Sequence, residues 1–133
     1  MEIASTKNLN VHEKAYAFSM EIFELTKQFP PEEKFALTSH IRRSSRSICL
    51  NLREAWAKRR YEAHFLSKLT DCDGENGETE PPLDFARDCG YISAGNHRAL
   101  ISMVTEVGKM LNGMMRKAGT FGVHARSPSA SDL

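Results

Sequence analysis

The sequence is poor in the residues and motifs that catalytic and metal centres need. Its three cysteines are far apart and form no Cys-x-x-Cys pair, so reduced thiols in a cytoplasmic protein are the simplest interpretation. None of the five histidines has an acidic residue three positions before it, as a di-iron helical bundle requires. No Gly-x-Ser-x-Gly motif or phosphate-binding glycine-rich loop is present. These absences argue against an enzyme, and we expect neither a metal nor another cofactor.

Long apolar runs and an excess of one charge are also missing. No segment approaches the length of a membrane span, and the N-terminus lacks the apolar segment of a secretion signal. We therefore expect a soluble cytoplasmic protein that does not contact a membrane. Lysine and arginine number 18 against 17 aspartate and glutamate residues, so the chain as a whole has no attraction for nucleic acid.

The charges are nevertheless separated along the chain. Residues 42–60 contain seven basic residues and a single acid, whereas residues 71–88 contain seven acids and a single arginine. Such a separation is typical of charged faces that either pair with each other or bind a charged partner.

Apolar residues recur at helical spacings of three and four in four segments, and no segment alternates as a β-strand does. Asn10 is expected to be the N-cap of the first helix, because Asn10 and Glu13 match the pattern of a capping box. Pro30-Pro31 should end it, since proline cannot donate a backbone hydrogen bond. The second helix is expected over residues 38–57.

The third helix should be interrupted. It is expected to run from about Glu62 to Gly90, but Pro81-Pro82 fall inside it, so we predict a kink or break near residues 79–82. Ser93 is suited to cap a fourth helix. The predicted fold is therefore all-α, an antiparallel up-down-up-down four-helix bundle with a kinked or broken third helix.

The two ends of the chain differ from the middle. Residues 1–9 are predicted to form a flexible arm, and residues 10–118 the bundle. Residues 119–133 contain few large apolar groups, so we expect a disordered tail there.

The second helix combines an apolar stripe with a line of arginines. Arg42, Arg46 and Arg53 fall within about 40° of one another on a helical wheel. Together with Arg43 and the basic turn Lys58-Arg59-Arg60 they form a line of roughly 25 Å, which could follow the phosphates of a nucleic-acid strand. The predicted nucleic-acid-binding residues are Arg42, Arg43, Arg46, Arg53, Lys58, Arg59 and Arg60.

Ion pairing is the alternative interpretation of these arginines. Asp71, Glu75 and Glu78 share one face of the third helix, within about 60°. The arginines could pair with these acids within one subunit or across an interface between subunits. The same three carboxylates could bind a hard cation, but a paired or solvated face is the favoured interpretation.

Two further features of the second helix also leave alternatives open. Trp56, beside the basic turn, could stack a base, although packing at the end of the bundle is favoured. Asn51 and Glu54 could form a hydrogen-bond network with polar residues of the third helix that fixes the helix register, or they could contact a ligand. The predicted structural or assembly residues are Asn51, Glu54, Asp71, Glu75 and Glu78.

Over residues 8–117 the sequence resembles the 23S ribosomal RNA intervening-sequence proteins. The resemblance rests on LTSHIRRSSRSICLNLREAWAKRR (37–60), FLSKLTDCDGENGET (65–79) and LDFARDCGYIS (83–93). It implies an antiparallel four-helix bundle that assembles as a ring, typically a homopentamer, with no known catalytic activity. It also implies kinship with the accessory protein of diversity-generating retroelements, a pentamer that binds nucleic acid and a reverse transcriptase. The chain departs from the family pattern at Arg53, where alanine is usual, and at Pro81-Pro82, where the third helix is usually continuous.

From these observations we expect a non-enzymatic homo-oligomer that binds RNA or DNA through phosphate contacts. The alternative is a structural or protein-interaction module whose charged faces serve assembly.

Overall fold

The computed structural model describes residues 9–121, and all regular secondary structure within them is helical. The helices are α1 (Asn10–Thr26), α2 (Leu37–Ala57), α3 (Glu62–Gly77), α4 (Glu80–Asp88) and α5 (Ala94–Arg116), with the short 3-10 helices η2 (Pro31–Glu33) and η3 (Ala118–Phe121).

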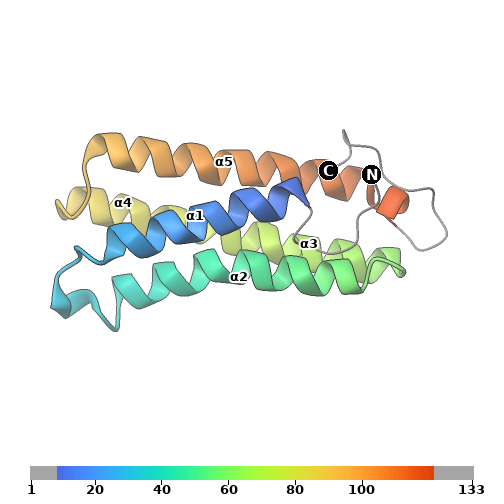
Figure 1. The fold of residues 1–133 in the computed structure, drawn as a ribbon, viewed down its shortest axis with the longest axis horizontal. Coiled ribbons are helices and arrows are strands. Elements are labelled where there is room, and N and C mark those ends of the chain that lie inside the picture. The colour runs from blue at the N-terminus through green and yellow to red at the C-terminus, as the bar shows by residue number, and fades with distance from the viewer. Residues whose placement is uncertain (1–8, 122–133) are drawn as a thin grey trace.

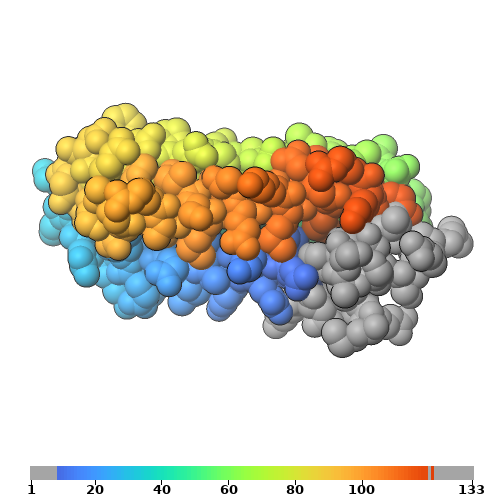
Figure 2. All heavy atoms as spheres, turned by 90° about the horizontal axis from the view of Figure 1, so that it is seen from above, coloured from blue at the N-terminus to red at the C-terminus, as the bar shows by residue number. Residues whose placement is uncertain are grey.

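The helices form an elongated antiparallel bundle (Figure 1). α1 and α2 lie side by side, α3 and α4 follow each other end to end as the third rod, and α5 closes the bundle. Figure 2 shows α5 between α1 on one side and α3–α4 on the other. The predicted up-down-up-down bundle is confirmed.

The core consists of the apolar stripes that helical periodicity predicts. One residue per turn or more points inward from every rod, and burying these side chains is the main source of stability. The largest fully buried side chains are Phe18, Phe65, Leu9, Ile22, Ile41, Ile48, Leu52, Leu69, Leu83, Leu111, Val11 and Val107.

The start of α1 differs from the prediction. The N-cap residue is Leu9, whose carbonyl accepts the Glu13 N–H at 3.1 Å, and no side chain caps the helix. Asn10 is already the first helical residue, so the predicted capping box was wrong. Leu9 is only 1 % exposed, and its burial fixes where the chain enters the helix. The bundle therefore includes Leu9, and the remainder of the predicted arm lies outside the described residues.

The predicted break in the third rod is confirmed. Helix α3 ends at Gly77, and after the turn at Glu78 and Thr79 helix α4 begins at Glu80. Pro81 and Pro82 stand in the first turn of α4, where backbone N–H groups have no partner inside the helix. The two prolines therefore interrupt the rod without removing a helical hydrogen bond.

The connection from α4 to α5 also follows the sequence pattern. Gly90 has a φ of +79°, a left-handed conformation that glycine adopts without steric cost. The Ser93 hydroxyl then accepts the Asn96 N–H at 3.0 Å and caps α5 as predicted. All three cysteines of the chain are free.

The C-terminal end of the bundle extends beyond the predicted boundary at residue 118. Residues 118–121 form η3, and Phe121 is buried with its ring centroid 5.9 Å from that of Trp56 and 5.7 Å from that of Phe65. The tail was wrongly predicted to start at residue 119, because a single buried aromatic side chain is enough to fix one more turn. Residues 122–133 lie outside the described residues.

Candidate nucleic-acid interface

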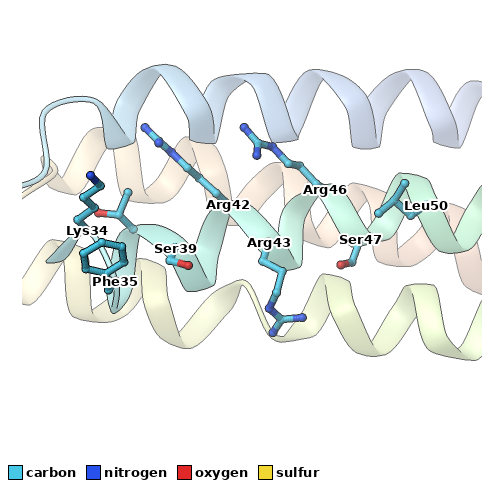
Figure 3. A pocket seen from close by; sticks show the side chains of 9 residues that line it. Lys34, Phe35, Ser39, Arg42, Arg43, Arg46, Ser47 and Leu50 are labelled. Atoms are coloured by element: carbon cyan, nitrogen blue, oxygen red, sulfur yellow. The ribbon is translucent and has the colours of Figure 1, made fainter.

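Helix α2 presents its arginines on both sides of its outer surface. Its inner face is fixed by buried residues that include Ile41, Ile48 and Leu52. Figure 3 shows Arg42 and Arg46 extending toward α1, whereas Arg43 extends in the opposite direction, toward α3. Arg42 and Arg46 therefore lie on one side, as the helical wheel indicates, and Arg43, which the wheel does not place with them, faces the other neighbouring helix.

Arg42 and Arg46 are held by an aromatic ring of α1. The Arg42 guanidinium carbon lies 4.8 Å from the centroid of the Phe23 ring, and that of Arg46 lies 5.7 Å from it. Arg42 Nε also donates to the Thr26 hydroxyl at 2.7 Å, and Arg42 Nη2 donates to the Phe23 carbonyl at 3.4 Å. Phe23 and Thr26 are uncharged, so they position the two guanidinium groups without neutralising their charge.

The predicted pairing of the arginine line with the acidic face of α3 is formed by Arg43 and not by the three arginines that share one face. Within residues 9–121, none of Arg42, Arg46 and Arg53 makes an ion pair, and Arg43 is the arginine that approaches Glu75, at 4.0 Å. The pKa of Glu75 is raised by burial and by the adjacent Glu78, although Arg43 opposes this shift. Most of the predicted intramolecular salt bridges are therefore not formed.

The other predicted assembly residues contact lysine or their own helix. Lys68 Nζ lies 2.8 Å from a Glu54 carboxylate oxygen and 3.6 Å from one of Asp71, and the bond from Lys68 lowers the pKa of Glu54. Asn51 donates to the Ser47 carbonyl of its own helix at 3.0 Å. The predicted network between Asn51 and polar residues of the third helix is not formed, because Asn51 bonds within α2.

The polar residues inside the third rod bond elsewhere. Asn76 donates to the Val104 carbonyl of α5 at 2.9 Å, and the Thr79 hydroxyl donates to the Asn76 carbonyl at 2.6 Å. Asn76 and Thr79 are both buried. The Asn76 bond therefore connects the end of α3 to α5 rather than to α2, and the Thr79 bond stays within the third rod.

A shallow groove of about 530 Å³ runs along the outer face of α2 (Figure 3). It contains four cationic side chains and no carboxylate, together with three hydroxyl groups and an exposed apolar side chain toward either end. The lining residues are Lys34, Phe35, Thr38, Ser39, Arg42, Arg43, Arg46, Ser47 and Leu50. Its cations and hydroxyl groups are all donors, which suits a ligand rich in anionic oxygen atoms.

The basic turn after α2 is separate from this groove. Arg59 Nη1 donates to the Trp56 carbonyl at 2.9 Å, and its guanidinium carbon lies 4.4 Å from the Trp56 ring centroid. Trp56 is 5 % exposed, so it packs at the end of the bundle, and the stacking platform that was the alternative is excluded. Arg60 is exposed, and Lys58 lines a small basic pocket of about 210 Å³ that also contains Lys68.

Sequence reasoning missed the residues that shape the groove. Nothing in the sequence indicated that Phe23 of the first helix would meet arginines of the second. Phe35 stands outside every periodic segment, and Leu50 lies off the apolar arc of its helix. The sequence does show that Phe35 and Leu50 lie outside the apolar stripes. A large apolar residue in such a position is a candidate for contact with a partner.

Comparison with known proteins agrees with the helical pattern. The sequence matches the model of the 23S rRNA-intervening sequence protein family over residues 7–113. The chain belongs to this family. It is also similar to a protein of unknown function from the S23 ribosomal protein family of Bacteroides thetaiotaomicron, whose crystal structure has a TM-score of 0.72 and 31% sequence identity and covers 80% of this chain and 98% of that one. A search of curated proteins found no match.

The described residues were also compared with the requirements of a membrane span and of a metal site. Within the part of the chain that the structure describes, no helix is long and apolar enough to cross a membrane. Among the same residues, no group of three or more His, Cys, Asp or Glu side chains is placed to bind a metal ion.

Proposed function

We propose that this member of the family is a cytoplasmic, non-enzymatic RNA-binding accessory protein that contacts phosphates through the groove on α2. The observation that supports the proposal is the composition of the groove: four cations, no carboxylate, and two arginines held by uncharged groups. Arginines whose charge is not consumed by an ion pair remain available to bind anions. The family name associates these proteins with 23S rRNA, which favours RNA over DNA as the ligand.

The proposed contacts read the backbone and not the bases. The groove offers guanidinium, ammonium and hydroxyl donors spread along α2, and a helix advances about 1.5 Å per residue. Such a row of donors tracks phosphates without sequence readout. If the chain assembles into the homopentamer that the family resemblance implies, five grooves act together and weak contacts add through effective concentration.

The basic turn Lys58-Arg59-Arg60 is a second group of cations at the far end of α2, separate from the groove. Lys58 and Arg60 are exposed, whereas Arg59 is engaged by Trp56. We assign the turn a secondary role, because fewer of its charges are grouped in one cavity.

The test is the salt dependence of RNA binding. Fluorescence anisotropy with a short mixed-sequence RNA is measured over a range of salt concentrations for the wild type and for an Arg42→Gln/Arg46→Gln variant. We expect the slope of log affinity against log salt to become shallower by about 0.7 for each phosphate of a single strand that the variant no longer binds. An Arg98→Gln/Arg116→Gln variant, which removes two exposed charges from α5, serves as the control and should keep the wild-type slope.

Absence of binding by the wild type at low salt would refute the proposal. Equal slopes for the groove variant and the α5 variant would also refute it, because the attraction would then come from net charge alone.

A structural or protein-interaction module is the second candidate. The observation that favours it is the exposure of large apolar side chains on α1, α2 and α4, which include Tyr16 at 56 %, Leu50 at 65 % and Phe85 at 64 %. Surfaces of this kind mark contacts between proteins. This function and RNA binding are compatible, and they are separated by the assembly measurement argued in the Discussion.

A further inference from the structure

Two exposed phenylalanines lie at the end of the groove where α2 begins. Phe35 is 89 % exposed and lines the groove, and Phe85 of α4 is 64 % exposed. Phe85 lines a second, mainly apolar cleft of about 330 Å³, which also includes His40, Pro81 and the residues directly after Phe35. Residues 34–43 therefore contribute to both cavities in alternation, and each cavity contains an exposed aromatic ring.

The surroundings of Phe35 are cationic. The Lys34 ammonium lies 5.3 Å from the centroid of the Phe35 ring, and Arg42 and Arg43 line the same groove. A ligand that fits this arrangement carries negative charge at close intervals and also offers flat unsaturated faces. A single nucleic-acid strand has both, because its phosphates are regular and its bases are free to leave the stack. In a duplex the flat faces of the bases are covered by their neighbours.

We propose that the groove takes single-stranded nucleic acid, with phosphates on Arg42 and Arg46 and a base stacked on Phe35. The cleft at Phe85 receives the adjacent base between an aromatic ring and the ring of a proline. This proposal rests on the proposed function and specifies the form of its ligand. Phe35 supplies affinity through its π-face, and the arginines supply the salt dependence.

The distance along the helix is consistent with a few nucleotides. Phe35 precedes α2 by two residues, and Arg46 stands ten residues into it, so the two ends of the site are separated by roughly 15 Å. A span of this size accommodates a short stretch of strand, comparable with the smallest site sizes of other single-strand binders.

The experiment compares one short fluorescein-labelled RNA as a single strand and annealed to its complement. Phe35→Ala should weaken binding of the single strand by roughly 5- to 150-fold and leave the salt slope unchanged, because no charge is removed. Phe35→Trp should restore the affinity, and its indole fluorescence should be quenched on binding, against the constant signal of buried Trp56.

The outcomes separate this proposal from the proposed function. The single-strand proposal is overturned if the wild type binds single strand and duplex with equal affinity, or if the Phe35→Ala variant keeps the wild-type affinity. In either case a salt slope that depends on Arg42 and Arg46 would still support RNA binding. Loss of all wild-type binding at low salt overturns both. A Phe35→Ala variant that changes the assembly mass by light scattering but not RNA affinity shows that this ring contacts protein, and it also overturns the proposal. Phe35 is almost fully exposed, so the variant is expected to fold, which a thermal melt verifies.

Discussion

Phe23 determines how two of the groove arginines are presented. A guanidinium group that lies on an aromatic ring keeps its charge and most of its N–H donors while its rotational freedom is restricted. The ring of Phe23 serves Arg42 and Arg46 at once. Phe23 thus holds two cations of the groove in place, although it does not line the groove itself.

Replacing Phe23 by leucine isolates this effect, because leucine retains apolar bulk at a half-buried site and removes the π-face. We expect the free energy of unfolding to fall by about 0.5–1 kcal/mol, since the contacts are partly exposed. RNA affinity should fall with the salt slope retained, because both charges remain. Phe23→Tyr is the matched control and should resemble the wild type. The two variants are compared by urea unfolding and by anisotropy, and a leucine variant with wild-type affinity would show that the ring does not position the arginines.

Glu75 provides a pH-dependent test of the contact between α2 and α3. Burial raises the pKa of Glu75 above its ordinary value of 4.5, and Glu78 adds to the shift. A carboxyl group with a raised pKa holds its proton more tightly in the folded chain, so its ionisation costs stability as pH rises through the ordinary value. We expect Glu75→Gln to be more stable than the wild type at neutral pH and equally stable in acid, where both side chains are uncharged.

Thermal melting of this variant across the acid-to-neutral range measures the difference. Asp71→Asn is the control, because Asp71 is an exposed acid of the same helix that lies 3.6 Å from Lys68 Nζ, so that variant should show no increase at neutral pH. A lower melting temperature of Glu75→Gln at neutral pH would mean that the contact with Arg43 outweighs the cost of burial.

Among the helices, the division of the third rod into α3 and α4 is the feature that depends most directly on sequence. The first turn of a helix has N–H groups without partners, so proline costs nothing there and restricts the unfolded chain. The prolines should therefore stabilise this fold, although they interrupt a rod that would otherwise be continuous.

Pro81→Ala tests this, because Pro81 is exposed and its replacement changes little packing. We expect the variant to be less stable by roughly 0.4–1 kcal/mol, through the larger conformational freedom of its unfolded chain. Urea unfolding gives the value, and Glu80→Ala in the same turn controls for the general effect of a substitution there. A gain in stability would indicate instead that proline strains the rod.

The helices and their ends show what the sequence can and cannot predict. Periodicity identifies the inner face of each helix, and Gly90 and Ser93 mark ends by local chemistry that needs no neighbour. Leu9 and Phe121 were missed because each is fixed by a distant contact and not by its own segment.

The candidate site was predictable to a lesser degree for a related reason. A helical wheel shows that Arg42 and Arg46 flank the apolar stripe of α2, but both α1 and α3 flank that stripe as well. Which of them receives the arginines depends on the rotation of α2 in the bundle, which the wheel does not contain. The sequence therefore shows which cations flank the stripe of α2, but it does not show which neighbouring helix each of them meets.

At the scale of the whole molecule, the exposed apolar side chains are candidates for contact with a second subunit. Met20 of α1 is 42 % exposed, and Leu50 of α2 is 65 % exposed. Tyr16, which is 56 % exposed, stands four residues before Met20, so the two side chains share one face of α1, and α1 lies beside α2 (Figure 1). The resemblance to ring-forming relatives leads us to expect that this face contacts a second subunit.

Light scattering tests that expectation, because a pentamer of 15.0 kDa chains has a mass of about 75 kDa. We expect Tyr16→Ser/Met20→Ser, at two residues outside the groove, to lower the assembly mass. Each buried side chain contributes of order 1 kcal/mol or more, and the same interface recurs between all neighbours of a ring. Phe85→Ser, at an exposed apolar residue of α4, is the control and should retain the wild-type mass. A wild type that is monomeric at all concentrations contradicts the prediction, and a mass lowered by the Phe85 variant alone would place the interface at α4. RNA affinity measured on the same samples then decides between the two candidate functions. If the dissociated α1 variant binds RNA with the wild-type affinity per subunit, the groove works without assembly. If no sample binds RNA, the assembly function remains.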